Sequence, residues 1–352
     1  DEACYRQFYE EAISLCRQKR FHEVLEKCRY TSLDDEEEYS IDVIQPEKIE
    51  FKQNSYEDGE NSIISFPEFL LLVLDVCTGG EQPASHYQPD KLIEKFDALK
   101  TYFTAGEFYE KMLYYRLLLD YYTIRRDIKD GQGNYSLILK GPKDDSDKLK
   151  QYQSMLYVST EAFYNWLKPY LRKLEQDELH SCAEMLAFLK KEDNERHSIL
   201  PARKDLSYKA SGNIRYWFWR LDYYLWEQRS TFFNEEEQKI VEHYVFRRNR
   251  SIEHLHPQDE SHNEEWEEEA VHSFGNLAMI SQSFNSQQSN DHIQIKFARI
   301  HEQISNKSLQ SIKMFLMCKL ADFNYLNWTM KLTKEHENEM IEFLERSFYI
   351  SD

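Results

Sequence analysis

Four side chains in the second half of the sequence have the types that hydrolysis of a phosphodiester bond requires. Glu253 and His254 are adjacent, Asn276 follows 22 residues after His254, and Asn285 follows 9 residues after Asn276. Carboxylate and amide oxygens are hard ligands that suit Mg²⁺ or Mn²⁺, so we predict Glu253 and Asn285 as metal ligands. His254 titrates near neutrality and is the natural general base. Asn276 is the predicted second catalytic residue, which would help orient the base or fix the intervening loop.

The spacing of these residues predicts a compact ββα unit that brings them together. We expect a strand ending near 253–254, a loop, a second strand over 277–281 and a helix from about 283. Adjacent residues on an ideal strand point to opposite faces, so Glu253 and His254 can share a site only where the strand twists or ends. Pro257 favours such an end.

The rest of the chain has the composition of a helical scaffold. It contains 24 Tyr, 21 Phe and 6 Trp but only 9 Gly and 8 Pro, which favours long packed helices over a turn-rich β fold. Residues 213–229 are apolar on nearly every side and predict a buried central helix. Core packing explains the aromatic stripe of this helix better than base stacking does. Ser65-Phe66-Pro67-Glu68 predicts a helix start.

The predicted fold class is therefore mainly α, with a local α+β part where the small ββα unit is embedded. We expect residues 1–235 to form a helical scaffold or linker, with a hairpin over about 121–139. Residues 236–352 would contain the ββα unit and the helices that close it.

The charge of the chain limits how it can meet nucleic acid. A formal net charge of −19 argues against broad nonspecific binding, although a local basic patch can still contact phosphates. Arg247, Arg248 and Arg250 are the best candidates for such contacts, and surface solubility explains them nearly as well. The acidic run at 264–269 is interpreted as a solvated face, since such runs rarely have a dedicated role.

Several features predict a reduced, cytoplasmic protein. No apolar run approaches the roughly 20 residues that a membrane span needs. The six cysteines lie far apart and form no CxxC pair, as is usual for reduced thiols. The chain begins Asp1-Glu2-Ala3, with neither Met nor a signal peptide, and we expect it to be a fragment of a longer protein.

The window around His254 resembles the C-terminal nuclease domain of GmrSD-type restriction endonucleases. That domain is an HNH-like member of the ββα-metal endonucleases. The resemblance covers residues 252–296 and rests on Ile-Glu-His-Leu-His-Pro-Gln from Ile252, Trp266, Phe-Gly-Asn-Leu-Ala-Met-Ile-Ser from Phe274, Asn285 and Lys296.

Carried over by position, the resemblance implies a role for each matching residue. Glu253 and Asn285 would be the ligands of one divalent ion, and His254 the general base. Asn276 would hold the loop, and Lys296 would face phosphate or stabilise the helix. His256 sits at a variable family position and receives no catalytic role. The implied activity is metal-dependent cleavage of DNA in a bacterial phage-defence restriction system.

The family also has an N-terminal domain that is associated with nucleotide binding and recognition of modified DNA, and carries a D-G-Q-[QR]-R motif. The nearest string, Asp130-Gly131-Gln132-Gly133-Asn134, lacks the arginine and sits in the expected hairpin turn. We therefore expect the partners to be DNA and a nucleotide-binding recognition domain or subunit that this chain does not contain.

Two other interpretations remain open at this point. The histidines could be ordinary packed or surface residues, or a zinc site without cysteine, formed by His254, His256, His262 and His272. The chain could also be a non-catalytic interaction or scaffold module with a degenerate HNH-like unit. Its acidity and the missing N-terminal half favour that alternative.

Overall fold

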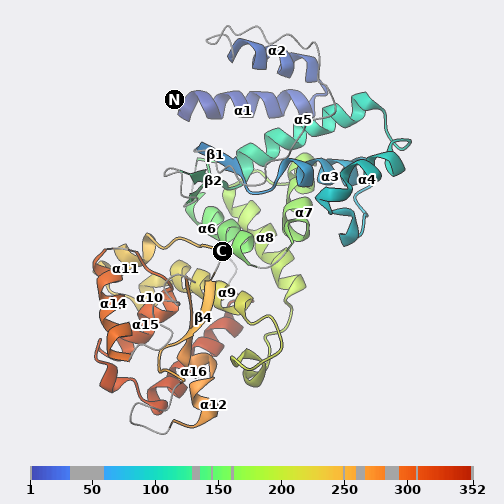
Figure 1. Ribbon diagram of the computed structural model, residues 1–352. Coiled ribbons are helices and arrows are strands. Elements are labelled where there is room, and N and C mark those ends of the chain that lie inside the picture. Colours follow the sequence, from blue (N-terminus) through green and yellow to red (C-terminus); the bar gives the residue numbers. More distant parts are fainter. Residues whose placement is uncertain are drawn as a thin grey trace. The chain divides into compact units, whose positions relative to one another are not determined.

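The fold is that of a computed structural model, shown in Figure 1. Two compact units emerge from it: unit 1 is Asp1–Ser146 with Phe163–Cys182, and unit 2 is Asp147–Ala162 with Ala183–Asp352. The mainly helical character predicted from the sequence is confirmed. The structure describes residues 2–31, 59–128, 135–143, 146–159, 162–248, 250–258, 266–281, 293–306 and 308–349.

Unit 1 combines helices with a three-stranded antiparallel sheet of order β1-β2-β3. Its strands β2 and β3 flank the predicted hairpin turn, whose residues 129–134 lie outside the described part. The helix α3 begins at the predicted place, because Ser65 and Glu68 form a reciprocal capping box. The elements are α1 (Glu2–Arg17), α2 (Phe21–Thr31), β1 (Gly59–Ser62), α3 (Phe66–Cys77), η2 (Ala84–His86), η3 (Pro89–Lys91), α4 (Leu92–Leu99), α5 (Ala105–Tyr122), β2 (Arg125–Ile128), β3 (Tyr135–Ile138) and α7 (Phe163–Glu175).

Unit 2 is built around a two-stranded antiparallel sheet and a buried central helix. Every residue from Tyr216 to Trp226 of α9 is buried, as the sequence predicted. The elements are α6 (Ser146–Val158), α8 (Cys182–Arg196), η4 (Arg203–Leu206), α9 (Arg215–Glu227), α10 (Arg229–Phe232), α11 (Glu235–Glu242), β4 (Arg250–His254), α12 (Glu268–Val271), η5 (Phe274–Asn276), β5 (Leu277–Ser281), α14 (Ile293–Ser305), α15 (Ile312–Leu320), η6 (Tyr325–Asn327) and α16 (Met330–Arg346).

The sheet places Glu253, His254 and Asn276 at one end of a shared core. In its register, Glu253 of β4 lies opposite Ala278 of β5, and His254 lies opposite Leu277. Residues 277–280 are buried on both faces, so β5 is a continuous apolar run and not an alternating one. The core on one side combines β5 with side chains of α14 and α15, and α9 also contacts β5. Figure 1 shows β4 near the middle of the unit.

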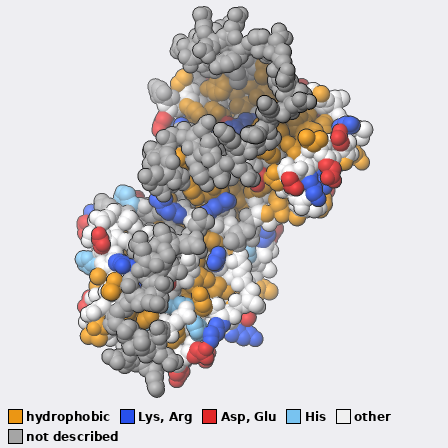
Figure 2. All heavy atoms as spheres, in the orientation of Figure 1, with side chains coloured by type: hydrophobic (Ala, Val, Ile, Leu, Met, Phe, Trp, Pro, Cys, Tyr) orange, Lys and Arg blue, Asp and Glu red, His pale blue; other side chains and the backbone are white. Residues whose placement is uncertain are grey.

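The division of the chain into 1–235 and 236–352 stays a prediction. Helix α9 precedes residue 236 and contacts β5, α15 and α16, so it is part of the same compact unit as the sheet. On the face shown in Figure 2, Lys and Arg side chains are interspersed with Asp and Glu side chains among the coloured atoms.

Candidate functional site

His254 is the last residue of β4 and is almost completely buried, with 3% of its surface exposed. Its Nε2 lies 3.1 Å from Nδ1 of His272, and the side-chain nitrogen of Gln258 lies 2.8 Å from its Nδ1. The ring of Tyr208 packs edge-on against it, with the two ring centroids 4.5 Å apart. Both ring nitrogens of His254 therefore have polar neighbours, and an aromatic ring fixes the plane of the imidazole.

The surroundings of His254 keep its imidazole neutral. Burial lowers the pKa of His254 to about 3, and the nearby His272 and Lys296 add to the effect. Burial likewise lowers the pKa of His272. A neutral imidazole has a lone pair on one nitrogen, which is the first requirement for a general base.

Glu253 is held by a buried lysine from α14. Its Oε1 accepts a hydrogen bond from Nζ of Lys296 at 2.5 Å, and the same ammonium donates to the His254 carbonyl oxygen at 2.8 Å. Burial raises the pKa of the Glu253 carboxyl, while the charge of Lys296 acts in the opposite direction. Lys296 thus joins the end of β4 to α14, and in this geometry it contacts a carboxylate and a carbonyl.

Asn276 uses all of its hydrogen-bonding capacity to hold the loop that follows β4. Its Oδ1 accepts from the backbone N–H of His256 at 2.8 Å and from Nε1 of Trp328 at 3.1 Å. Its Nδ2 donates to the carbonyl oxygens of His256 at 3.0 Å and Val271 at 2.9 Å. The catalytic role of Asn276 stays a prediction.

Two buried features fix the turn that carries Asn276. A Cβ atom on Gly275 would lie 2.3 Å from the carbonyl oxygen of Thr333, so only glycine allows α16 to pack this closely. Nζ of Lys313, which is completely buried, donates to the carbonyl oxygens of Phe274 at 2.8 Å and Leu277 at 2.6 Å. Burial lowers the pKa of Lys313 to about 7.

The phosphate contacts proposed for Arg247, Arg248 and Arg250 stay a prediction. The guanidinium of Arg248 donates to the carbonyl oxygen of Tyr157 at 3.2 and 3.1 Å and lies over the Tyr157 ring. Arg247 is exposed, and the side chain of Arg250 lies outside the described part.

His256 stacks on Trp266 with ring centroids 3.8 Å apart.

Sequence reasoning missed three contributors to this site. His272 appeared only within the zinc alternative, and its position four residues before Asn276 was the available signal. Gln258 belongs to the quoted motif but received no role. Lys313 lies in an apolar helical stretch and carries no sequence signal for its contact with the turn.

The described donors do not by themselves form a metal centre. Within the described ranges, no three or more His, Cys, Asp and Glu residues are grouped to hold an ion. One oxygen of Glu253 pairs with Lys296, and both Asn285 and His262 lie outside the described residues. Glu253 and Asn285 still offer the oxygen donors that Mg²⁺ or Mn²⁺ prefers, so a divalent ion there remains a proposal.

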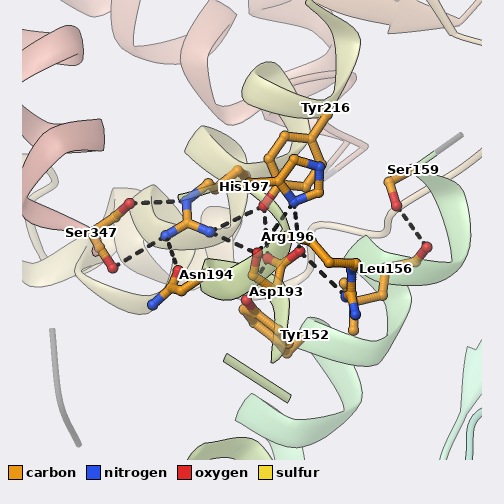
Figure 3. Close-up of polar contacts among 10 residues, drawn as sticks. Tyr152, Leu156, Ser159, Asp193, Asn194, Arg196, His197, Tyr216 and Ser347 are labelled. Carbon is orange, nitrogen blue, oxygen red and sulfur yellow. Dashed lines mark hydrogen bonds and ion pairs between the residues drawn. The ribbon is translucent and has the colours of Figure 1, made fainter. Parts of the chain in front are cut away.

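A second buried polar cluster in unit 2, shown in Figure 3, has a different character. Asp193 of α8 accepts from the hydroxyls of Tyr152 and Tyr216, each at 2.7 Å, and pairs with Arg220 at 3.2 Å. Its other oxygen lies 3.2 Å from Nδ1 of His197. Arg220 donates in turn to Asn194 Oδ1, Ser347 Oγ and the Ser347 carbonyl oxygen. The cluster joins α6, α8, α9 and the end of α16, as a structural network does.

The fold and the site together define a helical domain around a short sheet, with a Glu-His pair at a strand end and a Gly-Asn-Leu turn beside it. Residues 190–343 match the family model described as "GmrSD restriction endonucleases, C-terminal domain". The match covers less than half of the 352 residues, and it supports the likeness of this part of the chain to the C-terminal part of GmrSD-type proteins.

Other comparisons add little to this assignment. The chain has no match among the curated proteins or among the solved structures. Among the helices that the structure describes, none is both long and apolar enough to cross a membrane.

Proposed function

We propose that unit 2 is an HNH-like, metal-dependent endonuclease that hydrolyses DNA phosphodiester bonds. It would act in the bacterial cytoplasm as the nuclease part of a phage-defence system that restricts modified DNA. The observation that carries this proposal is the neutral, oriented imidazole of His254 at the end of β4, inside the region that matches the family model. A nucleotide-binding recognition domain or subunit would select the DNA.

In this proposal His254 takes a proton from the attacking water. The side-chain nitrogen of Gln258 lies beside Nδ1, so a water molecule must replace Gln258 there before it can be deprotonated. The imidazolium that forms would donate from Nε2 to His272, which stabilises it and keeps the ring in place. Because the pKa of His254 is about 3, proton transfer also needs nearby negative charge, and a bound phosphodiester supplies it.

Glu253 and Asn285 are the proposed holders of one Mg²⁺ or Mn²⁺ ion. Such an ion supplies positive charge to the scissile phosphate and the leaving oxygen. Lys296 positions Glu253 through the 2.5 Å contact, and its second contact with the His254 carbonyl keeps the base and the carboxylate in a fixed relation.

Substitution of His254 tests the assignment directly. The His254→Ala protein should lose nicking of supercoiled plasmid in Mg²⁺ or Mn²⁺ by a factor of about 10² to 10⁴, the usual contribution of a general base. His243→Ala is the matched control, because His243 is an exposed histidine of the same unit. A folded His254→Ala protein that nicks DNA as fast as the parent would show that the assignment is wrong.

The competing function is a non-catalytic interaction module. The closed state of the site favours it, since His254 is 3% exposed and Glu253 is paired with Lys296. Calorimetric titration with Mn²⁺ separates the two functions. One ion bound by the parent and lost in Glu253→Gln supports the nuclease. No binding, together with no nicking, supports the interaction module.

A further inference from the structure

A groove of about 460 Å³ lies in unit 2 between η4, α12 and the first turns of α16. We call it the η4–α16 groove, and its cations are Arg203 and Lys204 from η4 with Lys331 and Lys334 from α16. None of the four was a candidate from the sequence, and all four are exposed. The groove thus presents two pairs of accessible cations on neighbouring elements.

The η4–α16 groove adjoins the candidate active site through two consecutive residues. Ser207, which lines the groove, donates from Oγ to the carbonyl oxygen of His272 at 3.0 Å. The backbone N–H of Tyr208 donates to the same carbonyl oxygen at 3.0 Å, and the Tyr208 ring packs against His254. The wall of the groove therefore lies one residue from the aromatic contact of the proposed base.

The charges in the groove are unevenly distributed. The cations come from η4 and α16, whereas Glu267 and Glu269 lie beside and within α12, and Glu337 lies further along α16. The first turn of α16 contains no acidic residue, so its positive helix end adds to the charge of Lys331 and Lys334. The exposed Arg203 lies 3.7 Å from the carboxylate of Glu337, whose side chain is 12% exposed, so an anionic ligand would compete with that carboxylate for the guanidinium. An anionic chain would follow the η4 and α16 side and avoid α12.

One buried hydroxyl in the groove points to a ligand. Thr333 is 1% exposed and lines the groove, and its Oγ1 has no hydrogen-bond partner among the described residues. Buried polar groups are nearly always paired, and leaving one unpaired costs its desolvation energy. A hydroxyl can donate to a phosphate oxygen, so a phosphate in the groove would satisfy it.

We propose that the η4–α16 groove binds the phosphodiester backbone of DNA and leads the strand to His254. The inference deepens the proposed function and rests on it, since it names the surface that holds the substrate of that site. The cations and the Thr333 hydroxyl contact phosphate oxygens and fix register without reading the base sequence.

Charge removal in the groove tests the inference. The triple variant Arg203→Gln, Lys204→Gln, Lys334→Gln is titrated with a short fluorescein-labelled DNA duplex, without added Mg²⁺ or Mn²⁺. Its affinity should fall on the order of tenfold, and the slope of log K against log salt should become shallower by about 0.9 for each phosphate that the variant no longer neutralises. The matched control removes the same charge from exposed residues of unit 2 outside the groove, with Lys191→Gln, Lys239→Gln and Arg346→Gln.

The Thr333→Val variant provides a second readout, because it removes the hydroxyl and keeps the shape. Weaker DNA binding with unchanged or higher thermal stability supports the groove. A change in stability alone shows that the hydroxyl has no ligand and overturns this part of the argument.

The outcomes for the groove and for the nuclease are distinguishable. A triple variant with parental affinity and salt slope overturns the groove, while loss of nicking in His254→Ala would still support the nuclease. If the triple variant binds DNA more weakly but His254→Ala still nicks, the groove stands and the proposed base is wrong. If the triple variant binds an RNA duplex more weakly than the parent but binds the DNA duplex with parental affinity, DNA is not the ligand of the groove.

Discussion

Two buried polar groups of unit 2 differ in how their polar atoms are used. One is the Asp193–Arg220 network shown in Figure 3. The other is the His254 cluster, which consists of His254, Gln258, His272 and Tyr208. Both carboxylate oxygens of Asp193 are bonded within the network, and Arg220 completes it from α9. Burial raises the pKa of Asp193, but the hydrogen bond from His197 and the charge of Arg220 outweigh it, so the group stays ionised. The His254 imidazole stays neutral, and it contacts Tyr208, which is 43% exposed.

The difference separates two uses of buried polarity. A network that closes on itself, with charge balanced inside, specifies how helices pack. A neutral titratable group whose contacts lead to the surface can accept a proton when a substrate arrives. Burial alone therefore does not distinguish the two clusters. The protonation state of the central group does, since Asp193 is ionised and His254 is neutral.

The largest expected effect breaks the closed network. Arg220→Met should lower the free energy of unfolding by about 3–5 kcal/mol, because it removes the guanidinium that pairs with the buried Asp193 carboxylate at 3.2 Å. Chemical denaturation measures the loss. The partly exposed Arg229, which pairs with Glu242 at 3.7 Å, is the control, and Arg229→Met should cost at most about 1 kcal/mol. Equal denaturation midpoints for the two variants would contradict the structural role assigned to the network.

A smaller loss of stability is expected from a change at Asn276, which holds the loop beside the His254 cluster. Asn276→Ala removes the partner of the His256 and Val271 carbonyl oxygens and of the Trp328 indole N–H. We expect a loss of about 1–3 kcal/mol in unfolding free energy, as for buried groups left unpaired. Nicking should fall in the protein that remains folded, because the loop beside His254 is released. A destabilised but fully active variant would limit Asn276 to a structural role.

The smallest effect concerns the pH dependence of stability. His336 is completely buried, neither of its ring nitrogens has a partner among the described residues, and burial, with Lys313 nearby, lowers its pKa far below the usual value. The unfolded chain takes up this proton near pH 6.5 while the folded protein does not, so the folded state loses stability as the pH falls below about 6.5.

Replacing His336 should therefore make the protein less sensitive to acid. His336→Leu is expected to raise the free energy of unfolding by about 1.4 kcal/mol at one pH unit below the pKa of about 6.5 in the unfolded chain, with little change at pH 8. Thermal unfolding across this pH range measures the effect. An unchanged acid dependence would mean that His336 does not titrate on unfolding as described. The remaining acid sensitivity of the variant should come from the other histidines whose pKa is lowered by burial, including His254 and His256.

Local features of the sequence predicted local structure well. The capping residues Ser65 and Glu68 mark the start of α3, and the aromatic run of α9 is buried because no polar face is available to meet water. The resemblance to GmrSD-type proteins, which the family match over residues 190–343 supports, also followed from the short motif around His254. These signals act within a few residues of one another, where spacing and residue type decide the outcome.

Contacts over long sequence separations could not be predicted in the same way. Lys296 was expected to face phosphate or stabilise its helix, which stays a prediction, and its 2.5 Å contact with Glu253, 43 residues away, was not foreseen. Arg248 was expected to contact phosphate, which stays a prediction, and its contact with the Tyr157 carbonyl oxygen, 91 residues away, had no signal in the sequence. The direction of a long side chain depends on which carbonyl or carboxylate the folded chain brings near it, and neither periodicity nor proximity along the chain contains that information.

The close packing of Gly275 against Thr333 has a consequence for where a strand would be cut. The Gly275 backbone packs directly against the Thr333 carbonyl oxygen, so the turn that holds Asn276 lies close against the helix that presents Lys331 and Lys334. If the η4–α16 groove holds a phosphate as proposed, the fold fixes the distance between that phosphate and the bond that would face His254. A nuclease built this way would cut at a constant number of nucleotides from its point of attachment, whatever the sequence between them.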